Sequence, residues 1–105
     1  MQDLSKGYHT YYVYILTNKN RTTFYIGVTN NLKIRLQQHK DSIIDKTNSF
    51  VSRYNLEFLI YYETHTWIQI AIAREKEVKG WRREKKLNLI KSFNENLEFL
   101  NHHFQ

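Results

Sequence analysis

The chain has 105 residues, of which 41% are hydrophobic, enough for one modest core and therefore for a single domain over residues 1–105. It has no cysteine, which excludes a disulfide framework, a thiolate nucleophile and a cysteine-based zinc site. The formal net charge of +6 favours polyanionic partners, nucleic acid first and a membrane surface second.

Two segments near the N-terminus predict an antiparallel hairpin. Residues 11–16 (YYVYIL) and 23–28 (TFYIGV) are rich in β-branched and aromatic side chains, as strands are. The polar, Asn-rich stretch between them indicates a turn, and its shortness makes the pair antiparallel. Gly27, inside the second strand, indicates either a bulge or a place where another group approaches the backbone.

A helix is predicted over residues 32–40, directly after the hairpin. The preceding Thr-Asn-Asn supplies candidates for its N-cap. Leu32 and Leu36 are spaced i,i+4 and are expected to face the core. Arg35 and His39 have the same spacing and therefore share a second face.

The middle of the chain predicts a loop and a third strand. Residues 41–55 are polar and irregular, which indicates a loop anchored by Phe50, Val51 and Tyr54. Residues 56–63 (LEFLIYYE) have the composition of a strand.

Two further helices are predicted in the C-terminal half. Thr66 and Gln69 fit a capping box for a helix over residues 67–79, which Gly80 would end. Its expected inward stripe is Trp67, Ile70, Ala71, Arg74, Val78 and Trp81. A second helix over residues 82–93 would turn Leu87 and Ile90 inward, and the tail would pack through Leu97, Phe99 and Leu100.

The element order is strand, strand, helix, strand, helix, helix (ββαβαα). This predicts an α+β domain with a small three-stranded, mainly antiparallel sheet flanked by helices. No segment has the length of a transmembrane helix and the N-terminus has no apolar stretch, so we expect a soluble, cytoplasmic protein without a membrane partner.

Positive charge is concentrated in residues 74–91, which hold eight Lys or Arg against three Glu. A solvated helix face with i,i+4 ion pairs is one interpretation. The excess of positive charge favours the other, a surface for nucleic acid. The residues expected to contact phosphates are Lys79, Arg82, Arg83, Lys85 and Lys86.

An ordered set of motifs accompanies these elements. Tyr12-Val13-Tyr14, then Tyr25-Ile26-Gly27, then Asn31-Leu32, Arg35 and His39 resembles the GIY-YIG nuclease superfamily. The run Ala73-Arg74-Glu75-Lys76 with Lys79-Gly80-Trp81 resembles its branch of small, single-domain bacterial proteins, similar to the N-terminal nuclease module of the excision-repair incision subunit. Tyr12 replaces the name-giving glycine, and Asn88 is not in clear register with the asparagine of many members.

The resemblance implies a five-residue site. Tyr14, Tyr25, Arg35 and His39 would be catalytic, and Glu75 would hold a divalent metal. One carboxylate suits hydrated Mg²⁺ or Mn²⁺, which would neutralise charge on a phosphate. Arg35 offers a planar fork that matches a phosphate, and Tyr25 would orient the water or the phosphate. Either Tyr14 or His39 could take the proton from water.

These features predict a metal-dependent endonuclease that hydrolyses phosphodiester bonds in DNA, structure-selective or linked to repair or recombination. Nothing in the chain resembles a sequence-reading domain, so the site itself or a protein partner would choose the substrate. The choice between DNA and RNA stays open. The alternatives are a non-catalytic nucleic-acid-binding module on the same fold and a protein-interaction domain.

Overall fold

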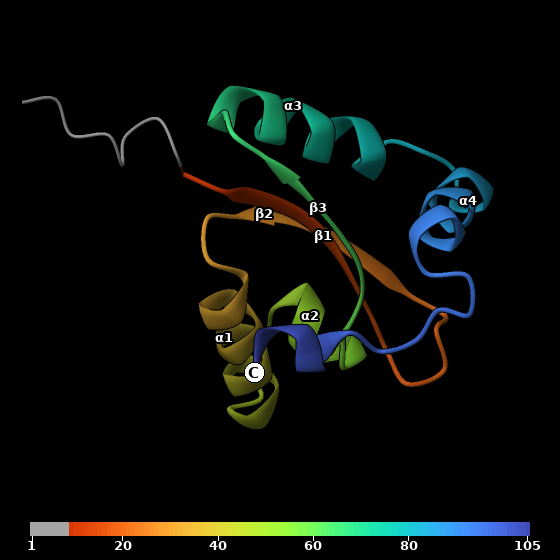
Figure 1. The fold of residues 1–105 in the computed structure, drawn as a ribbon. Helices are drawn as coiled ribbons and strands as arrows, with labels where there is room; N and C mark the ends of the chain where they lie inside the picture. Colours follow the sequence, from red (N-terminus) through yellow and green to blue (C-terminus); the bar gives the residue numbers. More distant parts are fainter. Residues whose placement is uncertain (1–8) are drawn as a thin grey trace, which may run out of the picture.

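The computed structural model describes residues 9–105, in which helices cover both faces of one sheet (Figure 1). The elements are β1 (Tyr11–Thr17), β2 (Phe24–Thr29), α1 (Leu32–Ile44), α2 (Phe50–Tyr54), β3 (Phe58–His65), α3 (Ile68–Lys79), α4 (Arg83–Phe93) and the short 3-10 helix η2 (Asn101–Phe104). This order confirms the predicted α+β class.

The sheet has the strand order β2-β1-β3, and both pairs are antiparallel, as the hairpin predicted. The register places Tyr14 of β1 opposite Gly27 of β2 and opposite Tyr62 of β3. Because side chains alternate along a strand, Tyr14 and Leu16 project from one face and Val13 and Ile15 from the other. β2 is an edge strand, so one of its sides is not covered by another strand of the sheet.

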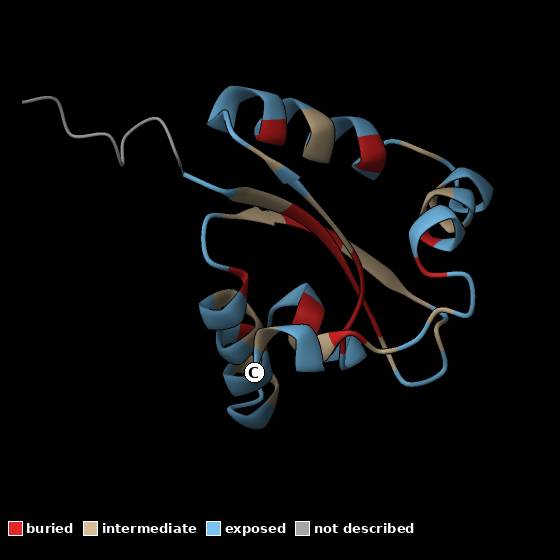
Figure 2. Cartoon of the chain, viewed as in Figure 1, coloured by how far each residue is buried: buried red, intermediate tan, exposed pale blue. Residues whose placement is uncertain are grey.

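The central strand is buried on both faces. One core combines Tyr14 and Leu16 with Leu32 of α1, Val51 of α2 and Leu100, and the other combines Val13 and Ile15 with Ile26, Ala71 and Val78 of α3 and Ile90 of α4. Figure 2 shows this burial as a continuous red stretch of β1 between the two helical layers. A strand buried on both sides needs an unbroken apolar sequence, which explains VYIL in place of an alternating pattern.

The prediction of a loop over residues 41–55 was wrong. Helix α1 continues to Ile44, and residues 50–54 form α2, whose first turn is capped by Ser49 Oγ accepting from the Ser52 N–H at 3.1 Å. Val51 reaches the core, whereas Phe50 and Tyr54 are exposed and contact each other. One buried side chain in a short helix is too weak a periodic signal to recognise in a polar segment.

The start of α3 also differs from the prediction. The helix begins at Ile68 with Trp67 as N-cap and without a side-chain capping bond, so the capping box at Thr66 does not form. Ala71 and Val78 face the core as expected, but Trp67 and Ile70 are 57% and 53% exposed. An apolar stripe read from sequence does not fix the rotation of a helix, because contacts to the sheet decide it.

The end of α3 and the C-terminal tail agree with the prediction. Gly80 follows the last residue of α3 and donates its backbone N–H to the carbonyls of Lys76 and Glu77. In the tail, Leu100 is buried, and Leu97 and Phe99 pack against the core on the α3 side. None of the helices formed by residues 9–105 combines the length and apolar character needed to cross a bilayer.

Candidate active site

A buried hydrogen bond joins two of the predicted site residues. The Tyr14 hydroxyl oxygen lies 2.8 Å from His39 Nε2, and the two residues are 0% and 5% exposed. The Tyr25 ring completes a triangle, with its centre 6.2 Å from that of Tyr14 and 5.4 Å from that of His39. Residues from β1, β2 and α1 therefore converge, as the sequence predicted.

Gly27 makes room for the Tyr14 ring. A β-carbon at this position would lie 2.5 Å from both Cζ and the hydroxyl oxygen of Tyr14, far inside van der Waals contact. Close approach is thus the correct one of the two interpretations, because the irregularity of the sheet lies elsewhere, between Ile15 and Leu16 of β1 where this strand pairs with β3. The phenol of Tyr14 reaches across the hairpin, so its hydroxyl ends over the edge strand β2.

Helix α1 carries the other two groups. Asn31 caps it by accepting from the Ile34 N–H at 3.0 Å, and the buried Leu32 fixes its first turn against the sheet. His39 lies on the buried face, and Arg35, one turn earlier, lies at its border, where its Nη1 donates to Gln38 Oε1 at 3.0 Å. The predicted shared face of Arg35 and His39 is therefore present.

Both members of the buried pair are neutral near pH 7. Burial raises the pKa of Tyr14, and the neighbouring Tyr25 adds to the rise, while Arg35 opposes it. Burial also lowers the pKa of His39 to about 4, and the positive charge of Arg35 contributes. A protonated phenol and an unprotonated imidazole fit one arrangement, in which the Tyr14 hydroxyl donates to Nε2.

Glu75 lies on α3, on the other side of the sheet. Its side chain is 15% exposed, and Lys79 Nζ lies 3.1 Å from its Oε2. Ala71 and Val78 mark the direction of α3 that faces the sheet. At 100° per residue, Arg74 and Glu75 flank this direction on opposite sides.

Arg74 shows which flank is which. Its Nε donates to Glu63 Oε2 of β3 at 3.0 Å, so the Arg74 flank of α3 faces β3. The Glu75 flank therefore faces the β2 edge, over which α3 also packs. Glu75 is not in contact with the Tyr14–His39 pair, but it lies toward the same edge strand.

Arg35 lies toward that edge from the opposite face. The flank of α1 that carries Lys33 and Lys40 borders η2, which is bonded to the backbone of Leu59 in β3. Arg35 is on the other flank of α1, away from β3. Groups on both faces of the sheet thus border β2, with the Tyr14 hydroxyl directed toward the same strand.

The candidate metal ligand is one carboxylate, that of Glu75. Within residues 9–105 no group of three or more His, Cys, Asp or Glu side chains is placed to hold a metal ion. A hydrated ion such as Mg²⁺, which uses one or two protein oxygens and keeps several waters, fits such a donor, whereas a structural zinc site needs a full set of ligands.

The predicted phosphate contacts have several different surroundings. Arg83 is engaged within the protein: its guanidinium donates to the carbonyls of Arg21 and Thr22, both at 2.9 Å, and lies over the Phe24 ring. Lys79 pairs with Glu75, and Lys85 Nζ lies 4.3 Å from the centre of the Trp81 ring. Arg82, exposed, and Lys86 have no ion pair in the described part of the chain, and Asn88 is exposed on α4.

A second polar cluster, around Glu63 on β3, was not predicted from the sequence. Its carboxylate accepts from Tyr61 at 2.6 Å, from Arg74 at 3.0 Å and from His65. Burial acts to raise the pKa of Glu63, but these donors outweigh it and lower that pKa. The available signal was the alternation Tyr61, Glu63, His65, which puts three polar groups on one face of a strand.

Comparisons with known proteins agree with this geometry. The model of the family described as GIY-YIG catalytic domain matches residues 10–88. Among solved structures, the solution NMR structure of the UPF0213 protein BH0048 from Bacillus halodurans is similar, with 26% sequence identity and a TM-score of 0.51, over 81% of this chain and 86% of that one. A search of curated proteins gave no match.

Proposed function

The chain belongs to the GIY-YIG family of nuclease catalytic domains, and we propose that it is a metal-dependent endonuclease that hydrolyses phosphodiester bonds in DNA. The observation that carries the proposal is the arrangement around β2. The Tyr14–His39 pair and Tyr25 meet on one face, and Arg35 and Glu75 border the same edge from opposite faces. A strand of nucleic acid lying along this edge would meet Tyr25, Arg35 and Glu75, and the buried Tyr14–His39 pair lies next to Tyr25.

Arg35 and Tyr25 receive the phosphate in this proposal. Both are partly exposed, unlike Tyr14 and His39, so they are the first groups that a ligand meets. The guanidinium offers donors in a planar fork that matches two phosphate oxygens. The Tyr25 hydroxyl can donate to a third oxygen or orient the attacking water.

His39 is the proposed acceptor of the proton from water, through Tyr14. The Tyr14 hydroxyl would take up that proton while giving its own to His39 Nε2, 2.8 Å away. The neutral imidazole is available because its pKa lies near 4. A phosphate bound at Arg35 offsets the positive charge that helps to lower this pKa, so substrate binding itself makes His39 more basic.

Glu75 would hold the divalent ion, Mg²⁺ or Mn²⁺. Its carboxylate is shielded from most of the solvent, and its one ion-pair partner in the described residues is the exposed Lys79, which can move away. A bound ion supplies charge neutralisation at the phosphate and stabilises the leaving oxygen.

The surface around α4 would hold the flanking duplex. Lys79, Arg82, Lys85 and Lys86 are proposed phosphate contacts, and Arg83 supports them by holding α4 against the β1–β2 turn. We propose a single-domain, cytoplasmic enzyme that selects DNA structure, with a role in repair or recombination, either alone or with a partner protein that directs it.

The direct test uses purified protein with branched, nicked and plain DNA duplexes and with RNA, in Mg²⁺ or Mn²⁺. We expect metal-dependent cleavage of at least one DNA substrate, lowered by a factor of about 10² or more in Tyr14→Phe, Arg35→Lys and Glu75→Gln. Glu77→Gln, two residues from Glu75 on the same helix, is the matched control and should cut normally. Absence of cleavage on every substrate, or normal cleavage by Glu75→Gln, contradicts the proposal.

A non-catalytic nucleic-acid-binding module is the second candidate. The observation that favours it is the complete burial of Tyr14, whose raised pKa keeps the phenol protonated. This function predicts salt-sensitive binding that is indifferent to divalent metal. Metal-dependent cleavage separates the two candidates.

A further inference from the structure

We propose that a cleft on the far side of α1 from Arg35 binds a single-stranded segment of the nucleic-acid substrate. The cleft lies between α1, η2 and the start of β3 and has a volume of about 670 Å³. Residues lining it include Lys33, Lys40, Phe58, Phe99, His102 and Phe104. The inference rests on the proposed function, because it assigns an unpaired part of the substrate to a second site; we call it the α1–η2 cleft.

Aromatic rings provide one wall of the cleft. The Phe58 and Phe99 rings are stacked, with centres 4.1 Å apart and planes 12° apart. The Arg21 guanidinium lies 4.2 Å from the centre of the Phe99 ring, and it is held there by donating to the Leu97 carbonyl at 3.0 Å. Arg21 and Phe58 therefore cover the two faces of the Phe99 ring. The three side chains form a stacked column, and Phe58 is its last ring. A nucleobase on Phe58 would extend it by one ring.

Phe104 supports the other end of the wall. Its ring packs edge to face against Tyr12 and Tyr62, with centres 5.8 and 4.9 Å away, which fixes η2 to the sheet. Asn101 fixes the same segment by hydrogen bonds to the backbone of Glu57 and Leu59. The aromatic wall is therefore built on the scaffold, and a ligand would find it in place.

Positive charge borders the cleft along α1. Lys33 and Lys40 lie on the same flank of the helix, seven residues and roughly 10 Å apart, a span that can reach two successive phosphates of an extended strand. Neither lysine has an ion pair within residues 9–105. Glu57 is the one carboxylate side chain of the lining, and Lys33 and Lys40 supply the positive border along α1 that complements a polyanion.

The combination selects an unpaired strand over a duplex. In a duplex the bases are stacked on one another and expose only their edges, so a recessed phenyl ring has no base face to contact. In a single strand the faces are free, and aromatic stacking with a basic border is the usual way of holding it. A volume of this size accommodates one or two nucleotides, which fits an unpaired end or flap next to the cleavage site.

Binding can be measured without cleavage by using the full chain in EDTA and a labelled single-stranded oligonucleotide of about six nucleotides, as DNA and as RNA. Fluorescence anisotropy at several salt concentrations gives the affinity and its salt dependence. Replacing both Lys33 and Lys40 by alanine should reduce the slope of log K against log salt by about 1.4, two phosphates at 0.7 each. Phe58→Leu should weaken binding at least about fivefold while keeping an apolar side chain.

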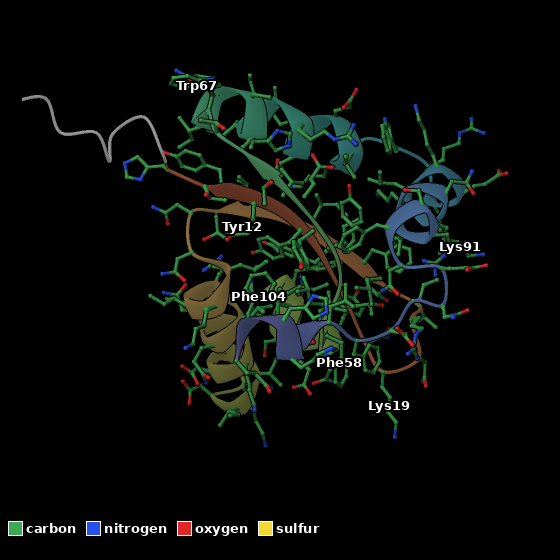
Figure 3. All side chains as sticks on the ribbon, in the orientation of Figure 1. Tyr12, Lys19, Phe58, Trp67, Lys91 and Phe104 are labelled. Atoms are coloured by element: carbon green, nitrogen blue, oxygen red, sulfur yellow. The ribbon has the colours of Figure 1, made fainter. Side chains whose placement is uncertain are left out.

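The control is Lys76→Ala with Lys91→Ala, which removes the same charge from α3 and α4. Figure 3 shows Lys91 on α4, away from Phe58 and Phe104 beside η2. This variant should keep the wild-type salt slope for the single strand. Amide NMR shifts on titration of the oligonucleotide should concentrate in α1 and η2, which a change in stability alone does not produce.

The two proposals fail in different ways. Equal salt slopes for the two double variants, or an unchanged affinity in Phe58→Leu, overturn the strand-binding inference while leaving cleavage of duplex DNA intact. If the protein cuts no substrate in Mg²⁺ or Mn²⁺ but the cleft variants still lose single-strand binding, the nuclease proposal fails and the cleft assignment stands.

Discussion

Replacing Gly27 with alanine tests the packing on which the candidate site depends. The new β-carbon would lie 2.5 Å from Cζ and from the hydroxyl oxygen of Tyr14, so the ring has to retreat by about 1 Å to reach an ordinary contact. A shift of this size displaces the Tyr14 hydroxyl from the position at which it makes its 2.8 Å bond with His39. Overpacking costs about 1–3 kcal/mol and an unsatisfied buried polar group about as much again, so we expect a loss of about 2–6 kcal/mol.

The assay is urea denaturation of a double-mutant cycle between Gly27 and Tyr14. In a Tyr14→Leu background the phenol atoms that cause the clash are absent, so Gly27→Ala should cost much less there, with a coupling energy of at least about 1 kcal/mol. Gly80→Ala is the matched control, since its β-carbon would lie 3.6 Å from the nearest atoms and its φ is −80°. That variant should change the free energy of unfolding by less than about 1 kcal/mol.

Two results would refute the reasoning. One is an equal cost of Gly27→Ala in both backgrounds, which would mean that the Tyr14 ring does not occupy the space over this glycine. The other is a cost no larger than that of Gly80→Ala. If nuclease activity is found, Gly27→Ala should also lower it, because the Tyr14–His39 bond is disturbed.

Three further predictions concern ionisable side chains. Folding lowers the pKa of His39 from its ordinary 6.5 to about 4, so as the pH drops the unfolded chain binds a proton before the folded chain does. The free energy of unfolding should therefore fall by about 3 kcal/mol between these two pH values. Denaturation of His39→Gln at several pH values should lack that part of the loss. Glu63→Gln should cost about 1–2 kcal/mol at pH 7, because it weakens a partly buried pair, whereas Glu77→Gln, 54% exposed, should cost less than about 0.5. Arg83→Lys should cost about 1 kcal/mol by losing the fork to two carbonyls, and Arg82→Lys almost nothing.

Each of these has a contradicting outcome. Parallel pH profiles for the wild type and His39→Gln would show that the imidazole titrates normally, which an NMR titration of the ring can check. Equal costs for the two glutamate variants would mean that the Glu63 cluster does not stabilise the fold. If Arg83→Lys leaves the free energy of unfolding unchanged, the hydrogen bonds of Arg83 to the β1–β2 turn do not stabilise the fold.

The elements that local sequence determines were predicted well. The aromatic and β-branched hairpin and the amphipathic turns of α1 follow from periodicities within a few residues, and so does the shared face of Arg35 and His39. The failures have one cause as well: α2 buries only Val51, and α3 turns Ala71 and Val78 toward the sheet while Ile70 stays exposed. Neither feature leaves a local periodic signal.

By itself the sequence determined the three-stranded α+β fold, the family and the residue types available for chemistry, because motifs and hydrophobic patterns are properties of neighbouring residues. It left two interpretations open for Gly27, and it placed Arg83 among the side chains expected to contact phosphates. Only the tertiary structure decided that Gly27 accommodates the Tyr14 ring, that Arg83 ties α4 to the β1–β2 turn, and that Glu75 lies across the sheet from Tyr14. Those facts arise from pairs of residues far apart in the chain, whose meeting depends on strand register and on how each helix is rotated against the sheet.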